Sequence, residues 1–207
     1  MEQEEIQDVV KILYDLYPEA GCALNFNSPF ELLISTILSA QCTDQRVNLV
    51  TEKLFKEYNT PYKIIELTEE SLQEKIKSCG LYKNKSKSIL GACRELIDKF
   101  HGEVPATMEE LTSLPGVGRK TANVVMANAF KIPTIAVDTH VFRVSNRIGI
   151  AHSENVYDTE KQLMKNINQK DWIKMHHCLI WHGRQICKAR NPKCQECGLK
   201  ELCEYAK

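Results

Sequence analysis

Lys120 and Asp138 are two residues of this 207-residue chain whose types could support nucleophilic chemistry together. Lys120 follows a proline–glycine turn, Leu114–Gly118, and opens a segment with helical periodicity. The positive end of a helix dipole disfavours a charged ammonium at that place and would favour the neutral amine that a nucleophile needs. The alternative role for Lys120 is a phosphate contact.

Asp138 follows the short apolar run Ile135–Val137 and precedes another helical segment. At a helix start it could be a plain N-cap. If both helix starts face one cleft, the carboxylate could take a proton from the amine of Lys120 and stabilise positive charge on a sugar. His140 could assist the reaction or only form hydrogen bonds within the structure.

The turn before Lys120 contains Gly116 and Gly118, which permit backbone conformations that a Cβ would obstruct. A glycine hairpin between two helices presents backbone N–H groups at a helix N-terminus, which suits a phosphate. Two basic runs without acidic residues, 80–94 and 184–193, could continue such a contact along a nucleic-acid backbone. Taken alone, either run could be a solvated face.

The end of the chain carries four cysteines with the spacing C-x6-C-x2-C-x5-C, namely Cys187, Cys194, Cys197 and Cys203. Four thiolates this close predict a metal site rather than disulfides in a reducing compartment. The alternatives are tetrahedral zinc and an iron–sulfur cluster, and the long arms around one C-x2-C favour the cluster. The first arm is basic and would be fixed in shape by a ligand at each end. Its basic residues are Lys188, Arg190 and Lys193.

Helical periodicity runs through almost the whole chain, and no segment alternates long enough for a confident strand. Capping boxes at Ser28–Glu31 and Thr107–Glu110 predict two helix starts, and Asp44 is placed to cap a third. Cys93 and Cys178 fall on apolar faces, so we expect them to be buried. The prediction is an all-α protein of about ten helices.

The composition is that of a globular protein, with 43% hydrophobic residues, 26% charged residues and a formal net charge of zero. Zero net charge argues against a protein held on DNA by bulk charge, but a local basic patch remains compatible with it. The acidic start, Met1–Glu5, lacks the form of a signal peptide, and no apolar run is long enough to span a bilayer. We therefore expect a cytoplasmic protein that is not secreted, associated with the nucleoid if the source is bacterial.

Three motifs in this order carry a family resemblance: Leu114–Ala122, Val137–Val144 and the four-cysteine tail. The chain resembles endonuclease III, a family of helix-hairpin-helix DNA glycosylases with an iron–sulfur cluster. The resemblance covers nearly the whole chain, including Leu38–Gln41 and Gly80–Tyr82. The adenine-mismatch glycosylase branch would share the cysteine spacing, but it lacks a lysine at the position of Lys120.

The resemblance implies two α-helical domains with DNA in the cleft between them. One is a six-helix domain, residues 21–132, that contains the helix-hairpin-helix. The other combines residues 1–20 with residues 133–207 and holds a [4Fe–4S] cluster on the loop 187–203. The cluster is not expected to perform the base excision itself.

The resemblance also implies a bifunctional DNA glycosylase and abasic-site (AP) lyase of base excision repair. Its substrates would be oxidised or ring-saturated pyrimidines in duplex DNA, and abasic sites. The damaged nucleotide is flipped out, Gln41 fills the vacated space, and Leu81 wedges into the opposite strand. Lys120 attacks the sugar C1′ with help from Asp138, and β-elimination through a Schiff base cleaves the strand 3′ to the site without a divalent ion.

Site residues follow from the resemblance position by position, with the four tail cysteines as cluster ligands. The residues expected to contact DNA are Gln41, Leu81, Gly116, Gly118, Arg119, Lys188, Arg190 and Lys193. We expect a monomer whose partner is double-stranded DNA with damaged bases or abasic sites, and no membrane. The rival hypotheses are a non-catalytic DNA-binding module with a zinc-held tail and a monofunctional mismatch glycosylase.

Overall fold

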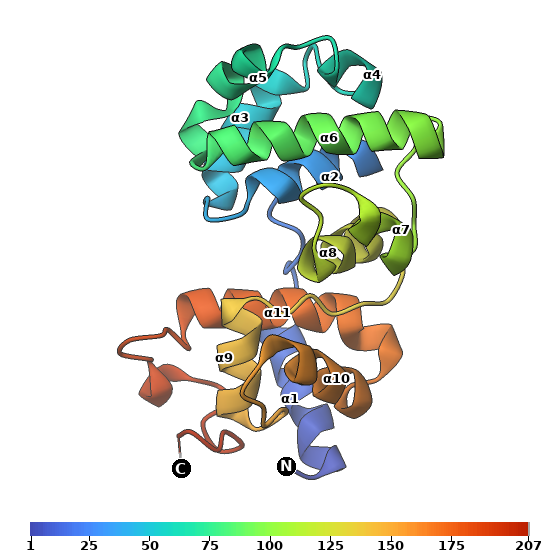
Figure 1. Ribbon diagram of the computed structural model, residues 1–207. Helices are drawn as coiled ribbons and strands as arrows, with labels where there is room; N and C mark the ends of the chain where they lie inside the picture. Colours follow the sequence, from blue (N-terminus) through green and yellow to red (C-terminus); the bar gives the residue numbers. More distant parts are fainter. Residues whose placement is uncertain (207) are drawn as a thin grey trace. The chain divides into compact units, whose positions relative to one another are not determined.

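The computed structural model describes residues 1–206, which contain eleven α-helices, three short 3₁₀-helices and no strand. The prediction of an all-α protein is confirmed. The chain forms two compact units (Figure 1), one of residues 22–131 and one of residues 1–21 together with 132–207. Because the second unit is built from both ends of the chain, we call it the terminal unit and the first the central unit.

The central unit contains seven of the α-helices. These are α2 (Pro29–Leu38), α3 (Asp44–Leu54), α4 (Pro61–Ile64), α5 (Glu69–Ile76), α6 (Tyr82–Phe100), α7 (Met108–Ser113) and α8 (Arg119–Ala129), with the 3₁₀-helix η1 (Lys77–Cys79) before α6. Every residue of α2 from Phe30 to Leu38 is buried, as expected for a helix that is apolar on most of its circumference. α2 packs against α6 and α8, so the core of this unit lies around it (Figure 1).

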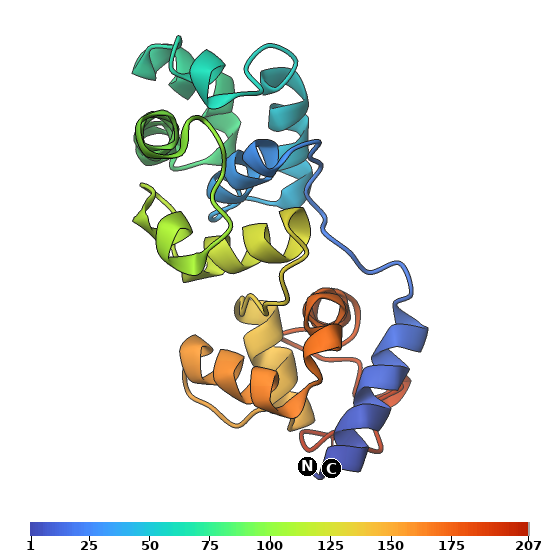
Figure 2. The ribbon, with the colours of Figure 1, turned by 90° about the vertical axis from the view of Figure 1, so that its right-hand side faces the viewer.

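The terminal unit contains α1 (Gln3–Leu16), α9 (Thr139–Ile148), α10 (Val156–Asn166) and α11 (Trp172–Gln185), with 3₁₀-helices η2 (Gln169–Asp171) and η3 (Cys194–Glu196). α9 and α11 meet closely at Gly183, where a Cβ would lie 3.0 Å from Cγ2 of Val144 and 3.1 Å from Cβ of His140. α1 packs against α11 and runs beside the cysteine-bearing tail (Figure 2). The N-terminal helix is therefore part of the framework that holds the tail.

The predicted capping boxes form only in part. Ser28 and Thr107 do cap α2 and α7, accepting hydrogen bonds from the backbone N–H groups three residues later. The carboxylate of Glu31, only 5% exposed, turns instead to the backbone N–H of Asn27 at 2.7 Å. The carboxylate of Glu110 accepts from the Thr107 hydroxyl at 2.6 Å. Buried or neighbouring donors thus compete successfully for these carboxylates.

The prediction for Asp44 is wrong by one residue. Thr43 is the N-cap of α3, since its backbone is extended and its hydroxyl accepts from the N–H of Arg46. Asp44 is the first residue of the helix, where its negative charge suits the positive end of the dipole. Cys93 and Cys178 are fully buried, as expected. No helix in the described part of the chain is long and apolar enough to cross a bilayer.

Candidate functional site

Lys120 is the second residue of α8 and its side chain is exposed. The turn before it depends on Gly116, whose φ of +77° lies in the left-handed region. A Cβ at Gly116 would also lie 2.6 Å from Cβ of Ser88 on α6. Glycine is therefore required there both by the backbone conformation and by close packing, and the turn that precedes Lys120 is held rigidly on α6.

Gly118 differs from the sequence-based expectation. Its φ of −95° and ψ of 176° describe an extended backbone that any residue can adopt. A Cβ there would meet no atom of the described chain within 4 Å. The fold itself therefore does not require glycine at this position. As the N-cap of α8, Gly118 supplies no capping side chain, so the helix start is left open toward an external acceptor.

Asp138 is the N-cap of α9, in the terminal unit, whereas Lys120 belongs to the central unit. Its Oδ1 atom accepts hydrogen bonds from the backbone N–H groups of His140 and Val141, each at 2.8 Å. The N-cap role is thus realised, and it uses only one of the two carboxylate oxygens. Asp138 keeps its second oxygen for a further partner.

His140 forms its hydrogen bond within the terminal unit. Its Nδ1 atom lies 3.2 Å from Nη2 of Arg143, which acts as the donor. Burial lowers the pKa of His140, and the nearby arginines lower it further against the raising effect of Asp138. The imidazole is therefore neutral at neutral pH and accepts at Nδ1. The hydrogen bonding within the structure that the sequence allowed for His140 is therefore present.

Gln41 and Leu81 share an unusual backbone conformation in the central unit. Their φ angles are +53° and +47°, and both are exposed, Leu81 at 50%. Gln41 lies in the turn after α2, and Leu81 is the N-cap of α6. The left-handed region costs a residue with a Cβ about 1–2 kcal/mol. Such strain persists only where the surroundings enforce it. His101 and Lys131 of the same unit also have left-handed backbones, so the conformation by itself does not mark a functional site.

The basic run 80–94 does not behave as one surface. Lys83, Lys87 and Arg94 are exposed, but Lys85 is 4% exposed. Its Nζ atom donates to the backbone oxygens of Leu38 at 2.8 Å and Cys79 at 2.7 Å. The expectation that this whole run follows a nucleic-acid backbone is wrong for Lys85, because its ammonium points into the protein.

The four tail cysteines line one space, together with residues that include His182 and Leu199. Nevertheless, no three His, Cys, Asp or Glu side chains in residues 1–206 are grouped closely enough to hold one metal ion. A single zinc ion would need its thiolates to converge to about 2.3 Å from the metal. Four thiols that border one space without converging on one point fit a polynuclear iron–sulfur cluster better than zinc.

A buried pair of residues stands behind one of these thiols. The Tyr17 hydroxyl lies 2.9 Å from Nδ1 of His182, and Nε2 of His182 lies 3.5 Å from Sγ of Cys197. Burial raises the pKa of Tyr17 to about 12 and lowers that of His182 to about 4, so the phenol is protonated and the imidazole neutral. If Tyr17 donates to Nδ1, the imidazole proton lies on Nε2 and faces the sulfur. Sequence analysis missed this pair because its members lie at opposite ends of the chain.

The basic arm is held by α9 as well as by its flanking cysteines. Arg147 donates to the backbone oxygens of Lys188 at 2.7 Å and Ala189 at 3.1 Å. Nε of Arg143 donates to the backbone oxygen of Cys187 at 3.1 Å. The side chains of Lys188, Arg190 and Lys193 are exposed. α9 therefore has two roles: its N-cap is Asp138, and its side chains Arg143 and Arg147 hold the basic arm. The second role could not be inferred from the sequence motif around Val141.

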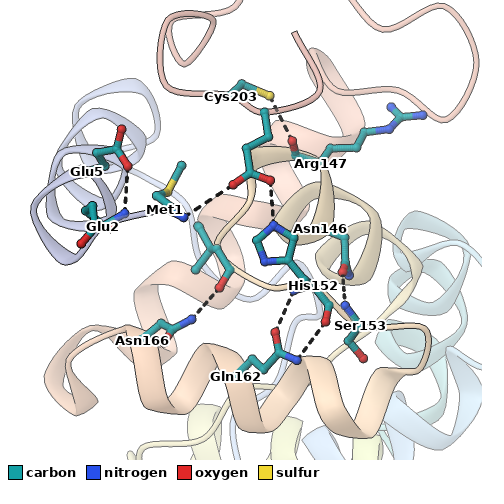
Figure 3. A network of polar contacts seen from close by, with 12 residues as sticks. Met1, Glu2, Glu5, Asn146, Arg147, His152, Ser153, Gln162, Asn166 and Cys203 are labelled. Carbon is teal, nitrogen blue, oxygen red and sulfur yellow. Dashed lines mark hydrogen bonds and ion pairs between the residues drawn. The ribbon is translucent and has the colours of Figure 1, made fainter. Parts of the chain in front are cut away.

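The last part of the tail is anchored by a network of polar contacts around the N-terminus (Figure 3). The carboxylate of Glu204 lies 3.6 Å from the amino group of Met1 and 2.7 Å from Nε2 of His152. The backbone N–H of Glu204 donates to the oxygen of Ile148 at the end of α9. This network joins both ends of the chain next to the ligand candidate Cys203.

Comparison with known proteins agrees with these features over almost the whole chain. A family model of HhH-GPD superfamily base excision DNA repair proteins matches residues 34–169, and the iron–sulfur binding domain of endonuclease III matches residues 187–203. Endonuclease III of Bacillus subtilis (strain 168) is 48% identical over 201 residues, which cover 97% of this chain and 92% of the relative. The chain belongs to the endonuclease III family. Endonuclease III of Escherichia coli (strain K12) is also 48% identical, over 96% of this chain and 94% of the relative.

Solved structures agree with this membership. A trapped covalent intermediate of endonuclease III with DNA, an estranged-adenine complex, matches with a TM-score of 0.95 and 47% identity over 100% of this chain and 97% of that one. A thermostable thymine-DNA glycosylase, 24% identical with a TM-score of 0.88 over 98% of this chain and 97% of that one, shares the fold. Membership in the endonuclease III family makes the protein a DNA glycosylase with AP lyase activity in base excision repair, with a [4Fe–4S] cluster. The predicted family, fold, activity and cofactor are confirmed, and neither rival hypothesis is favoured.

Proposed function

We propose that Lys120 is the nucleophile of this glycosylase and lyase and that Asp138 assists it on oxidised or ring-saturated pyrimidines. The strongest support is the position of Lys120, exposed in the first turn of a helix whose start has no side-chain cap. The Gly116 turn behind it packs closely on Ser88 of α6, which fixes where this helix start lies. A backbone that already places the nucleophile near its target lowers the entropy cost of reaching the transition state.

The chemistry needs a neutral amine and a nearby carboxylate. Nζ of Lys120 forms a bond to the sugar C1′, and the bond from C1′ to the base nitrogen breaks, with its electron pair leaving on the base. Oδ2 of Asp138 takes a proton from the attacking amine, while Oδ1 remains in the N-cap. The negative charge of Asp138 also stabilises the positive charge that develops on the sugar.

Strand cleavage follows from the same bond. Opening of the sugar ring leaves an imine between Nζ of Lys120 and C1′. The imine acidifies the C2′ proton, whose removal expels the 3′ phosphate by β-elimination. Hydrolysis of the imine then restores the lysine. A single chain carries Lys120 and Asp138, and we propose that it acts as a monomer.

Contacts with duplex DNA are divided among three parts of the chain. Gly116, Gly118 and Arg119 hold a phosphate at the open start of α8. The exposed basic arm, with Lys188, Arg190 and Lys193, contacts the backbone further along. Gln41 fills the space left by the extruded nucleotide, and Leu81 wedges into the opposite strand.

The four tail cysteines are proposed as the ligands of the [4Fe–4S] cluster. Burial raises the pKa of the thiols of Cys197 and Cys203, and the positive charge of bound iron would favour their deprotonated form. The cluster supplies a rigid support for the arm between Cys187 and Cys194. The arm then meets DNA in a preformed shape, which limits the entropy lost on binding.

Borohydride trapping tests the role of Lys120. Reduction of the imine should link the wild-type chain covalently to duplex DNA with an oxidised pyrimidine. Lys120→Ala should lose trapping and strand cleavage by about 10⁴-fold or more, since it lacks the nucleophile. It should still bind a tetrahydrofuran analogue of an abasic site. Lys99→Ala, which changes an exposed lysine at the end of α6, is the matched control. Trapping of Lys120→Ala at the wild-type level would exclude Lys120 as the nucleophile.

A further inference from the structure

Lys85 is a buried charged residue that the proposed chemistry does not use. Its side chain comes from the first turns of α6 and ends between two backbone oxygens, those of Leu38 and Cys79. Burial lowers its pKa, while the thiols of Cys42 and Cys79 are the titratable groups that face it. Burying an ammonium is costly, so a lysine here needs a function that an apolar residue of similar size would not perform.

Both acceptors end a helical segment. Leu38 is the last residue of α2, and Cys79 is the last residue of η1. The final carbonyl groups of a helix have no partner within it and form the negative end of its dipole. The ammonium of Lys85 satisfies one such group on each element. It therefore joins two segment ends that lie 41 residues apart in the chain (79 minus 38).

The turns that follow these two ends carry Gln41 and Leu81. Gln41 is three residues after Leu38, and Leu81 is two residues after Cys79. The backbone N–H of Lys85 donates to the oxygen of Leu81 at 3.0 Å. Lys85 thus holds the Leu81 turn on both sides, through its main chain after the turn and its ammonium before it.

We infer that Lys85 is a positioning residue that fixes the Gln41 and Leu81 turns relative to each other, so that both side chains can enter the DNA stack together. This inference rests on the roles proposed above for Gln41 and Leu81. Their left-handed backbones are strained and need enforcement by the surroundings. Two charge-assisted hydrogen bonds from one ammonium supply that enforcement at both turns.

Lys85→Met tests the inference, because methionine keeps the length and apolar stem of lysine but removes the ammonium. Two readouts are needed. The first is 2-aminopurine fluorescence opposite a tetrahydrofuran site, which reports unstacking of the duplex without any chemistry. The second is lyase activity on an abasic site in duplex and in single-stranded DNA, because a single strand needs no duplex opening. Lys99→Met removes an exposed charge from the same helix and is the control.

We expect Lys85→Met to lose about ten- to a hundredfold in lyase rate on duplex DNA, since small displacements at a site have effects of that size. Single-strand activity should stay within about twofold of wild type, because the position of Lys120 on α8 is unchanged. The fluorescence signal should fall with the duplex rate. Equal losses on both substrates, or no loss on either, would overturn the inference.

A second variant keeps the test decisive if Lys85→Met does not fold, as judged by circular dichroism and iron absorbance. Lys85→Gln retains a neutral amide donor on a shorter side chain and loses the charge, so it should show the same duplex-only loss in weaker form. The double variant Gln41→Ala with Leu81→Ala tests the underlying roles separately. If this double variant keeps wild-type unstacking, the proposed roles fail. If it loses unstacking but both Lys85 variants keep it, only the Lys85 inference fails.

Discussion

The starts of α8 and α9 are the same structural feature arranged in two opposite ways. At α8 the N-cap is Gly118, which has no side chain to offer, and the next two residues are the cations Arg119 and Lys120. At α9 the N-cap is Asp138, whose carboxylate bonds two N–H groups of its own helix. One helix start is open and positive, and the other is closed by an internal anion.

The difference shows that the positive end of a helix dipole can serve either an external anion or a carboxylate of the protein itself. An uncapped positive end with added cations is unfavourable for the folded protein alone, and it becomes favourable when an external anion binds. A helix start capped by its own carboxylate is already satisfied and instead fixes the orientation of that carboxylate. In the function proposed above, the start of α8 receives the DNA backbone and the start of α9 presents an oriented negative charge.

Among the substitutions that test this comparison, those of Asp138 have the largest expected effect, and they separate its charge from its capping role. Asn is as good an N-cap as Asp, so Asp138→Asn should keep the free energy of unfolding. Loss of the proton acceptor should lower base excision by about 10²–10⁴-fold. Asp138→Ala should show a similar kinetic loss and also unfold about 1 kcal/mol more easily. Denaturant titration measures the free energy of unfolding, and single-turnover base release measures the rate of excision. Full activity of Asp138→Asn would show that the start of α9 does not act through the negative charge of Asp138.

The two glycines of the α8 turn have the next largest expected effects, and these effects should differ in kind. The methyl group added by Gly118→Ala meets no atom of the described chain within 4 Å, so the variant should fold. Its affinity for DNA should fall by about tenfold if the methyl group displaces one phosphate contact of about 1.4 kcal/mol. Gly116→Ala conflicts with Ser88 and with the φ of +77°, so it should lose about 1–3 kcal/mol of stability. Melting curves and binding isotherms on one abasic-analogue duplex compare them. Because alanine is a poorer N-cap than glycine, a small loss of stability is expected for Gly118→Ala, but a loss as large as that of Gly116→Ala would contradict an open helix start.

The basic arm should show a smaller and unselective effect. Lys193 is exposed, and on binding DNA it would give up its surface ion pair with Glu196, at 3.1 Å. Lys193→Glu should weaken binding to damaged and undamaged DNA alike, and the slope of affinity against salt should fall by about one. Lys170→Glu, at an exposed site outside the tail, is the charge-matched control. Lost discrimination between the two DNAs at unchanged affinity would contradict a phosphate contact.

The smallest expected effect concerns the anchor of the tail. The hydrogen bond from His152 lowers the pKa of Glu204, so the ionised carboxylate is more stable in the folded chain than in the unfolded one. That stability is fully present above the unfolded pKa of about 4.3 and is lost as the pH falls through the folded pKa. Because Glu204 is largely exposed, Glu204→Gln should cost no more than about 0.5 kcal/mol at pH 6. Urea titrations should show a smaller difference in the free energy of unfolding between Glu204→Gln and wild type at pH 3 than at pH 6. A larger difference at pH 3 would show that the ionised carboxylate of Glu204 is not what stabilises the anchor.

Local patterns were sufficient where the decisive interactions lie within one turn of chain. The N-cap at Asp138, the helix start at Lys120 and the left-handed Gly116 follow from residues next to one another. The same patterns failed for Asp44 and for the partners of Glu31, since several nearby groups compete for one hydrogen bond and the sequence does not rank them. Gly118 looked like a second conformational glycine, but its backbone is ordinary.

The sequence alone determined the family, the all-α class and the cysteine tail, because motif order and cysteine spacing are properties of the chain itself. Only the tertiary structure decided which basic residues are available to a partner. Lys85 lies in the same run as Lys83 and Lys87, yet folding buries it against the ends of two helical segments. The tertiary structure likewise placed Tyr17 behind His182 and Arg147 under the basic arm. Burial and long-range hydrogen bonds depend on which distant segments pack together, and that information is absent from any short stretch of sequence.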